Sequence, residues 1–215
     1  MSTLSHILSW FKGRQPSMVH SPSNLEQPRI EDNSSIYFHE DDYCQIELVP
    51  RENEGFLIAQ GAEIQRSAEK NFDGYGYKGI HVRSEEPVSL STKGIALEQM
   101  ADILRDCGFH RIDQVFTGYS SHSELVKNAV AFKHDPYEIY MDHKDGILDH
   151  VWLYLHWGAS PESKQQLIDA FDRIGQKWQL LLSHWPWSQV VDLTDRSAIE
   201  NYVTVNPHDR TPREG

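Results

Sequence analysis

The sequence predicts an α+β fold, with a mainly antiparallel sheet and helices packed on one face. Stretches with the period of strands and stretches with the period of helices are interleaved along the chain. The strands expected between Ala129 and Trp157 are linked by turns that are too short for parallel crossovers. With 215 residues, of which 39% are hydrophobic and 24% charged, the chain can bury a core as one large domain or as two sub-domains.

The strands are expected where apolar and polar residues alternate, or where a short apolar run lies between turn signals. The alternation is clearest from Tyr43 to Val49. Asp135-Pro136 and Asp145-Gly146 mark tight turns between neighbouring strands. In chain order, the predicted strands are 36–49, 75–82, 87–90, 112–119, 129–134, 137–142, 148–157 and 190–193.

The helices are expected where apolar residues recur every three or four positions. The apolar stripe from Leu97 to Cys107 predicts a helix that Gly108 ends. Ser160-Pro161 predicts a helix start, because serine caps the first turn and proline fits the first helical position, and the stripe that follows continues to Leu181. Two further helices are expected, over 51–70 and from about 194 to 203.

The domain organisation follows from composition. Residues 1–14 carry apolar side chains at helical spacing and predict an amphipathic helix. We expect it to dock on the protein's own body or on a partner, and favour this over attachment to a membrane surface. Residues 15–35 predict a flexible linker, 36–205 the α+β domain, and 206–215 a disordered tail. A sub-domain division near residue 121 is left open. No stretch approaches 18 consecutive apolar residues, so no membrane-spanning helix is expected.

The net charge of the chain limits which classes of partner are expected. The 32 acidic residues exceed the 20 basic ones, which gives a net charge of −12 with histidine neutral. Such a surface repels phosphate backbones, so no nucleic-acid partner is expected. The two cysteines, Cys44 and Cys107, are too few for a four-ligand zinc site. We interpret them as reduced core residues, with a single disulfide as the alternative.

An acidic run, His39-Glu40-Asp41-Asp42, precedes Glu47 by a few residues. Clustered carboxylates can form a solvated surface turn, attract a basic protein partner, or hold a cation. The spacing matches no calcium loop, because there is no central glycine. Further along the chain, Trp185 and Trp187 follow the longest predicted helix. Tryptophan in a loop either anchors an interface or closes the end of a small core.

A second group of polar residues lies on the predicted hairpin around Asp145-Gly146. It consists of Asp142, His143, Asp149 and His150. Histidine and carboxylate ligands converging across a hairpin suit zinc or non-haem iron, so a metal-dependent hydrolase or oxygenase is the alternative function. Strand histidines packed against aromatic residues are the more common case, and we otherwise expect no cofactor.

Two segments carry a family resemblance. The first, from Tyr37 to Pro50, reads YFHEDDYCQIELVP, and the second joins Asp73-Gly74-Tyr75-Gly76-Tyr77 to Ile80-His81-Val82-Arg83. Both resemble segments of small acidic proteins encoded beside bacterial polymorphic toxins, including Rhs-type and type VI secretion effectors. The resemblance implies an immunity protein, which binds its cognate toxin in the cytoplasm and blocks it. It covers about a quarter of the chain.

This resemblance and the charge together give the leading hypothesis. The chain is expected to be an inhibitor without catalytic residues or cofactor, whose partner is the cognate toxin effector. An acidic inhibitor approaches a basic toxin faster, because opposite charges attract over a long range. The predicted toxin-binding residues are Glu40, Asp41, Asp42, Glu47, Trp185 and Trp187.

Overall fold

The computed structural model describes residues 34–76, 78–79, 82–119, 122–155 and 158–205. The predicted amphipathic helix (1–14), nearly all of the linker (15–35), the point near residue 121 and the predicted tail (206–215) lie outside this described part. None of the helices that it contains is both long and apolar enough to cross a membrane.

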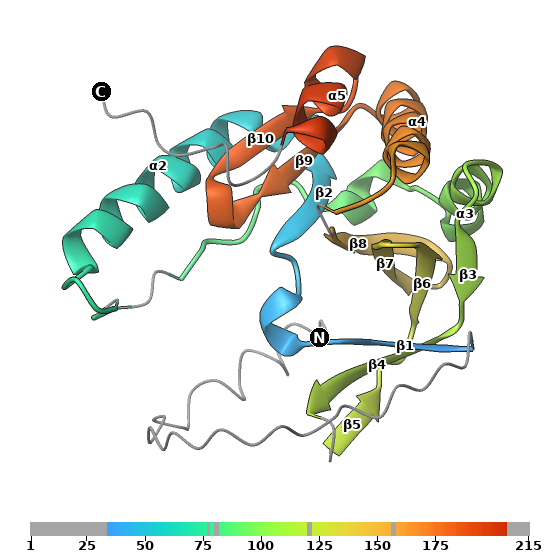
Figure 1. Cartoon of the computed structure of the whole chain (residues 1–215), viewed down its shortest axis with the longest axis horizontal. Helices are drawn as coiled ribbons and strands as arrows, with labels where there is room; N and C mark the ends of the chain where they lie inside the picture. The colour runs from blue at the N-terminus through green and yellow to red at the C-terminus, as the bar shows by residue number, and fades with distance from the viewer. Residues whose placement is uncertain (1–33, 77, 80–81, 120–121, 156–157, 206–215) are drawn as a thin grey trace.

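Two sheets form the framework of the molecule (Figure 1). The larger has seven strands in the order β10-β9-β2-β8-β7-β6-β3, and every neighbouring pair is antiparallel. The smaller has the order β1-β4-β5, with β1 and β4 parallel. The strands are β1 Ser35–Phe38, β2 Ile46–Pro50, β3 His110–Ile112, β4 Gln114–Tyr119, β5 His122–Leu125, β6 Ala129–His134, β7 Tyr137–Lys144, β8 Ile147–Tyr154, β9 Leu180–His184 and β10 Gln189–Asp192.

Three helices cover one side of the large sheet, which we call the helical face. They are α3 Leu97–Asp106, α4 Pro161–Trp178 and α5 Arg196–Thr204. Their apolar stripes bury Met100, Phe171 and Ile199 completely against the sheet. As predicted, Ser160 caps α4, accepting a hydrogen bond from the Ser163 amide at 3.1 Å. The predicted α+β class, with a mainly antiparallel sheet and helices packed on it, is confirmed.

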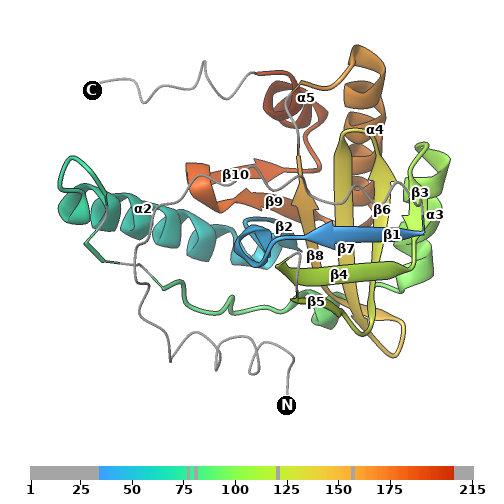
Figure 2. The same ribbon diagram turned by 60° about the horizontal axis from the view of Figure 1, so that its bottom comes forward.

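The other side of the large sheet, the opposite face, is covered in two parts. The small sheet lies over β6, β7 and β8, where Phe38 and Val115 pack against Tyr140 and Trp152. The fourth helix, α2 Glu54–Asn71, lies over β2, β9 and β10, and buries Leu57 beside Leu181 and Trp185. Between these two parts lies η2, the short 3-10 helix Glu40–Asp42, which follows β1 (Figure 2).

Several local predictions are corrected. The segments 75–82 and 87–90 were expected to be strands, but their described residues form turns and irregular chain before the short helix η4 (Leu90–Lys93). The stripe of α4 was extended to Leu181, which instead lies in β9, because Gln179 adopts a left-handed conformation that ends the helix. Both cysteines are buried and free, as predicted.

Candidate functional site

The acidic run of the sequence forms η2, on the surface of the opposite face. The ring of His39 caps this short helix, since its Nδ1 accepts a hydrogen bond from the Asp41 amide at 3.2 Å. Asp41 is strongly exposed, with 82% of its side chain accessible, while Glu40 and Asp42 are half-buried. Three successive carboxylates are therefore presented to solvent on one short turn.

Glu47 lies in β2, the strand that follows η2 along the chain. Only 5% of the residue is exposed. One carboxylate oxygen accepts hydrogen bonds from the indole Nε1 of Trp185 and, at 3.3 Å, from Arg83. Burial and the nearby charge of Glu86 raise the pKa of Glu47 to about 7, although Arg83 and Trp185 favour its ionised form. Ionising this carboxylate therefore costs free energy, mainly because it is buried.

Asp142 lies in β7, where it directly faces His150 of β8. Its Oδ2 accepts a hydrogen bond from the Tyr43 hydroxyl at 3.3 Å, whereas its buried Oδ1 has no partner. Burial, with the charge of Asp149 adding to it, raises the pKa of Asp142 to about 7. Tyr43 comes directly after η2, so its hydroxyl connects the exposed turn to this buried carboxylate.

These acidic residues come from η2, from the strands β2, β7 and β8 of the large sheet and from the loop after α2, and we call them together the carboxylate cluster. Cys44 is close to two members of the cluster. Burial raises the pKa of its thiol, and the charges of Glu47 and Asp142 raise it further. Arg83 reaches into the cluster from the loop and also donates to the Cys44 carbonyl oxygen at 3.2 Å. The members of the carboxylate cluster are Glu40, Asp41, Asp42, Glu47, Glu86, Asp142 and Asp149. Chemically, this arrangement favours an incoming cation over an anion.

The two predicted tryptophans lie in different places. Trp185 is buried, with the guanidinium of Arg83 stacked 4.4 Å above its ring, so it belongs to the support of Glu47. Trp187 is half-buried and stacks on the ring of His184 at 3.8 Å, next to Tyr202 of α5. The structure therefore brings Trp185, but not Trp187, together with the acidic residues.

The four residues of the predicted metal site are only partly brought together. Asp142 faces His150, but His143 faces Leu148 because the strand pairing shifts at Asp142 and His143. The Oδ2 atom of Asp149 lies 3.8 Å from the Nδ1 atom of its neighbour, His150. Within the described part of the chain, no group of three or more histidine, cysteine, aspartate or glutamate side chains has a geometry that could hold a metal ion.

Sequence reasoning assigned no role to Arg83 or Glu86. Their sequence signal is a short charged run, Arg83-Ser84-Glu85-Glu86, directly after the segment that was taken for a strand. A loop with such charges is ordinary, and nothing local indicates that one arginine turns inward. Arg83 meets Glu47 only because the chain returns from α2 across the sheet.

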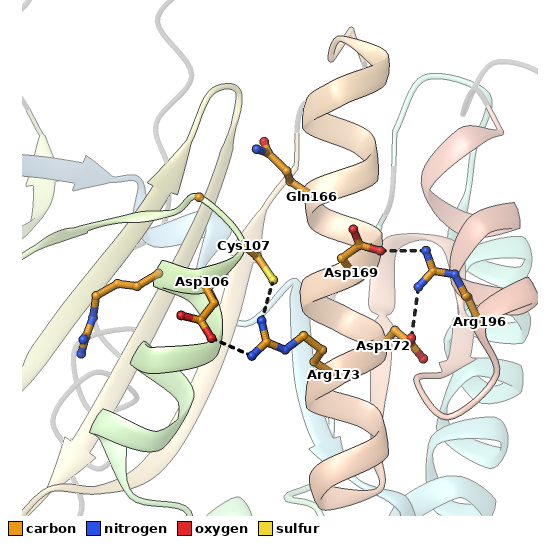
Figure 3. Close-up of a pocket in the computed structure, with 9 residues that line it drawn as sticks. Asp106, Cys107, Gln166, Asp169, Asp172, Arg173 and Arg196 are labelled. Carbon is orange, nitrogen blue, oxygen red and sulfur yellow. Dashed lines mark hydrogen bonds and ion pairs between the residues drawn. The ribbon is translucent and has the colours of Figure 1, made fainter.

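A hollow of about 490 Å³ lies on the helical face, between the end of α3, α4 and the start of α5 (Figure 3). Arg173 donates to Asp106 at 2.8 Å and approaches the Cys107 sulfur at 3.7 Å. Arg196 pairs with Asp169 at 2.7 Å and with Asp172 at 3.1 Å. Since these charges neutralise one another across the helices, the hollow is better explained as a joint between helices than as a ligand site.

The comparisons with known proteins leave these observations to stand alone. No family model, no curated protein and no solved structure matches the chain.

Proposed function

We propose that this chain is an immunity protein of a bacterial polymorphic toxin system, of the Rhs or type VI secretion kind, and that it acts in the cytoplasm. In this proposal it binds a cognate toxin effector through the opposite face and neutralises it by protein–protein contact, without catalysing a reaction. The resemblance of the segment from Tyr37 to Pro50 supports the class. The structure gives separate support, which comes from where the negatively charged side chains lie.

The single observation that carries the proposal is the convergence of the carboxylate cluster. Negative side chains from separate segments lie on one side of the sheet. Burial raises the pKa of both Glu47 and Asp142 to about 7, and the charge of Glu86 adds to this at Glu47 and that of Asp149 at Asp142. On the helical face, by contrast, Asp106, Asp169 and Asp172 each pair with an arginine. A basic partner would relieve the repulsion, and its approach would be accelerated by the same field.

The predicted binding residues divide into contacts and supports. Glu40, Asp41 and Asp42 are positioned to meet a partner's lysines or arginines directly, because η2 lies at the surface. Glu47 and Trp185 are buried, so in this proposal they hold Arg83 and the strand beneath η2 in place. Trp187 packs beside α5 and is the weakest of the six candidates.

The test is binding to the purified product of the neighbouring toxin gene, by surface plasmon resonance. A triple variant, Glu40→Lys with Asp41→Lys and Asp42→Lys, is expected to lower the association rate constant by about 10- to 100-fold at low salt. The effect should shrink as salt rises, because salt screens exposed charges. In cells, the same variant should lose protection against the toxin.

The matched control changes the net charge equally on the helical face, with Asp102→Lys, Asp106→Lys and Glu162→Lys. It should keep the association rate within about threefold, because long-range attraction depends on where the charge lies. Equal losses for both triple variants would reduce the effect to net charge alone. No binding by the unaltered chain would contradict the proposed function.

The metal-dependent enzyme is the alternative hypothesis, and the described geometry gives it less support. Asp142 and His150 face each other, but no third ligating side chain of the described residues joins them in a suitable arrangement. Elemental analysis of the purified protein is the direct measurement. A stoichiometric metal whose removal by chelator lowers the thermal midpoint would favour this alternative.

A further inference from the structure

The exposed apolar side chains of the described residues are unevenly distributed. The large ones are Tyr37, Ile58, Phe72, Tyr75, Val82, Leu125 and Tyr154. None of them belongs to α3, α4 or α5. Four of the seven lie on α2 or on the loop that follows it. Clustering of this kind on a protein surface marks contact sites more often than scattered exposure does.

The end of α2 and the turn after it form a projecting arm. The helix is anchored through its first half, where Leu57 is buried and an added methyl group at Gly61 would lie 3.2 Å from Ser188. Beyond Ile64, no described residue of α2 is buried. Figure 1 shows α2 extending away from the strands, with its last turn far from the sheets.

The tip of this arm is held in a defined conformation. The carboxylate of Asp73 accepts hydrogen bonds from the amides of Tyr75 and Gly76, both at 3.0 Å. The Asp73 amide donates to the Gly76 carbonyl, and the Lys78 amide to that of Asn71. Tyr75 is nevertheless 101% exposed and Phe72 is 54% exposed. Because these bonds hold the backbone of the turn, only the two side chains lose conformational freedom when the rings are bound, which lowers the entropic cost of binding.

The arm is connected to the carboxylate cluster. The chain leaves the tip, exposes Val82, and then places Arg83 between Glu47 and the ring of Trp185. Glu86, a few residues on, is itself a member of the cluster. The tip is therefore joined to Arg83 and Glu86 of the acidic surface by a short stretch of chain.

We propose that Phe72 and Tyr75 insert into an apolar cleft of the same protein partner whose basic surface meets the carboxylate cluster. This inference rests on the proposed function and adds a second contact of different chemistry. The charges around the tip are mixed, with Arg66, Lys70 and Lys78 close to Glu69 and Asp73, so its binding energy is expected to come from the rings.

A cleft in a partner fits this tip better than a second copy of the chain does. Each aromatic side chain buries at most about 150–250 Å². Two tips packed against each other would thus bury less than about 1,000 Å², whereas a stable specific interface needs about 1,200 Å² or more. Insertion into a partner that also covers the acidic surface adds the two areas together.

The experiment compares three variants of the full chain with the unaltered protein, using the purified product of the neighbouring toxin gene as the probe. Phe72→Ser with Tyr75→Ser is expected to weaken binding by about 30-fold, mainly through faster dissociation and equally at all salt concentrations. Tyr75→Phe keeps the ring and should bind as the unaltered chain does. The triple variant of Glu40, Asp41 and Asp42 should instead slow association in a salt-dependent way.

The outcomes separate the two proposals. An unchanged dissociation rate in the double variant, together with slower association of the charge-reversed triple variant, would overturn the role proposed for Phe72 and Tyr75 and would leave the proposed function standing. A dimer in sedimentation velocity that the double variant abolishes would assign the tip to a second copy, and would also overturn the inference. Absence of binding by the unaltered chain overturns the proposed function and, with it, the partner assigned to the tip. Circular dichroism of the double variant should be unchanged, because both rings are exposed.

Discussion

The two faces of the large sheet differ in how their charged side chains are paired and their apolar side chains are buried. On the helical face, arginine and carboxylate side chains pair across α3, α4 and α5, and the apolar stripes are buried. On the opposite face, Asp142 keeps a buried oxygen without a partner, and Tyr75 stands in solvent. The carboxylates named above are paired on the helical face and only partly paired on the opposite face, although Gln166 Oε1 of α4 is also buried without a partner.

This difference indicates on which face a functional surface is expected. Natural chains satisfy packing, capping and charge pairing almost everywhere, and departures concentrate where a surface is used for something besides folding. The helical face contains the one sizeable hollow described above, yet its charges are already paired. The opposite face carries the buried carboxylates of Glu47 and Asp142 and the exposed ring of Tyr75, and a protein partner needs no pocket.

The largest expected effect tests the closeness of packing on the helical face. A methyl group added at Gly175 of α4 would lie 1.8 Å from the carbonyl oxygen of Leu193, which is backbone and cannot rotate away. Gly175→Ala should therefore lower the free energy of unfolding by about 3 kcal/mol or more, measured by urea denaturation.

The same substitution in α2 serves as its counterpart. An added methyl group at Gly55 meets nothing within 4 Å, so Gly55→Ala should raise the free energy of unfolding by up to about 1 kcal/mol through helix propensity. Similar effects at the two glycines would mean that Leu193 does not pack against Gly175 as closely as the structure shows.

Sequence patterns predicted the helical face well, because its information is local. The stripe of α3, the cap at Ser160 and the tight turn at Asp145-Gly146 each depend on neighbouring residues, and each is found in the structure. The helix was predicted to continue to Leu181, which lies in β9, since a short apolar run fits either state and only the sheet decides.

The opposite face was harder to predict, because its contacts join distant segments. The acidic turn was visible as Glu40-Asp41-Asp42, but the closeness of Glu47 to Arg83 depends on the path of the chain after α2. Asp142 was a predicted ligand only in the alternative metal-site hypothesis, because its hairpin is rich in histidine. Its link to Tyr43, across 99 residues, has no sequence signal.

The next prediction compares an unpaired with a paired carboxylate by their response to pH. The pKa of Asp142 is raised to about 7 in the folded protein, above its unfolded value, so its contribution to stability is lost as pH rises from about 4 to 7. Asp142→Asn should remove about 3 kcal/mol of this pH dependence, measured by urea denaturation from pH 4 to 8.

Asp192 gives the opposite sign. Burial acts to raise its pKa, but hydrogen bonds from Arg51 and Thr194 outweigh burial and hold the pKa below its ordinary value. Its contribution is present at neutral pH and lost as pH falls, so Asp192→Asn should destabilise the protein at pH 7 and have less effect at low pH. If both variants shifted the pH profile in the same direction, the distinction between paired and unpaired carboxylates would not hold.

The smallest expected effect concerns the ordered tip of the arm. The described residues of the turn, 72–76 and 78–79, are exposed or half-buried, so Asp73→Ala should leave the thermal midpoint unchanged within about 1 °C. It removes the acceptor of two amides, and hydrogen exchange at Tyr75 and Gly76, followed by NMR, should become faster. Asp73→Asn keeps a side-chain oxygen in place and should retain most of the protection. If the amides of Tyr75 and Gly76 exchanged at the same rate in Asp73→Ala as in Asp73→Asn, the backbone hydrogen bonds alone would hold the turn. The order of the tip would then come from the end of α2 and not from the Asp73 carboxylate.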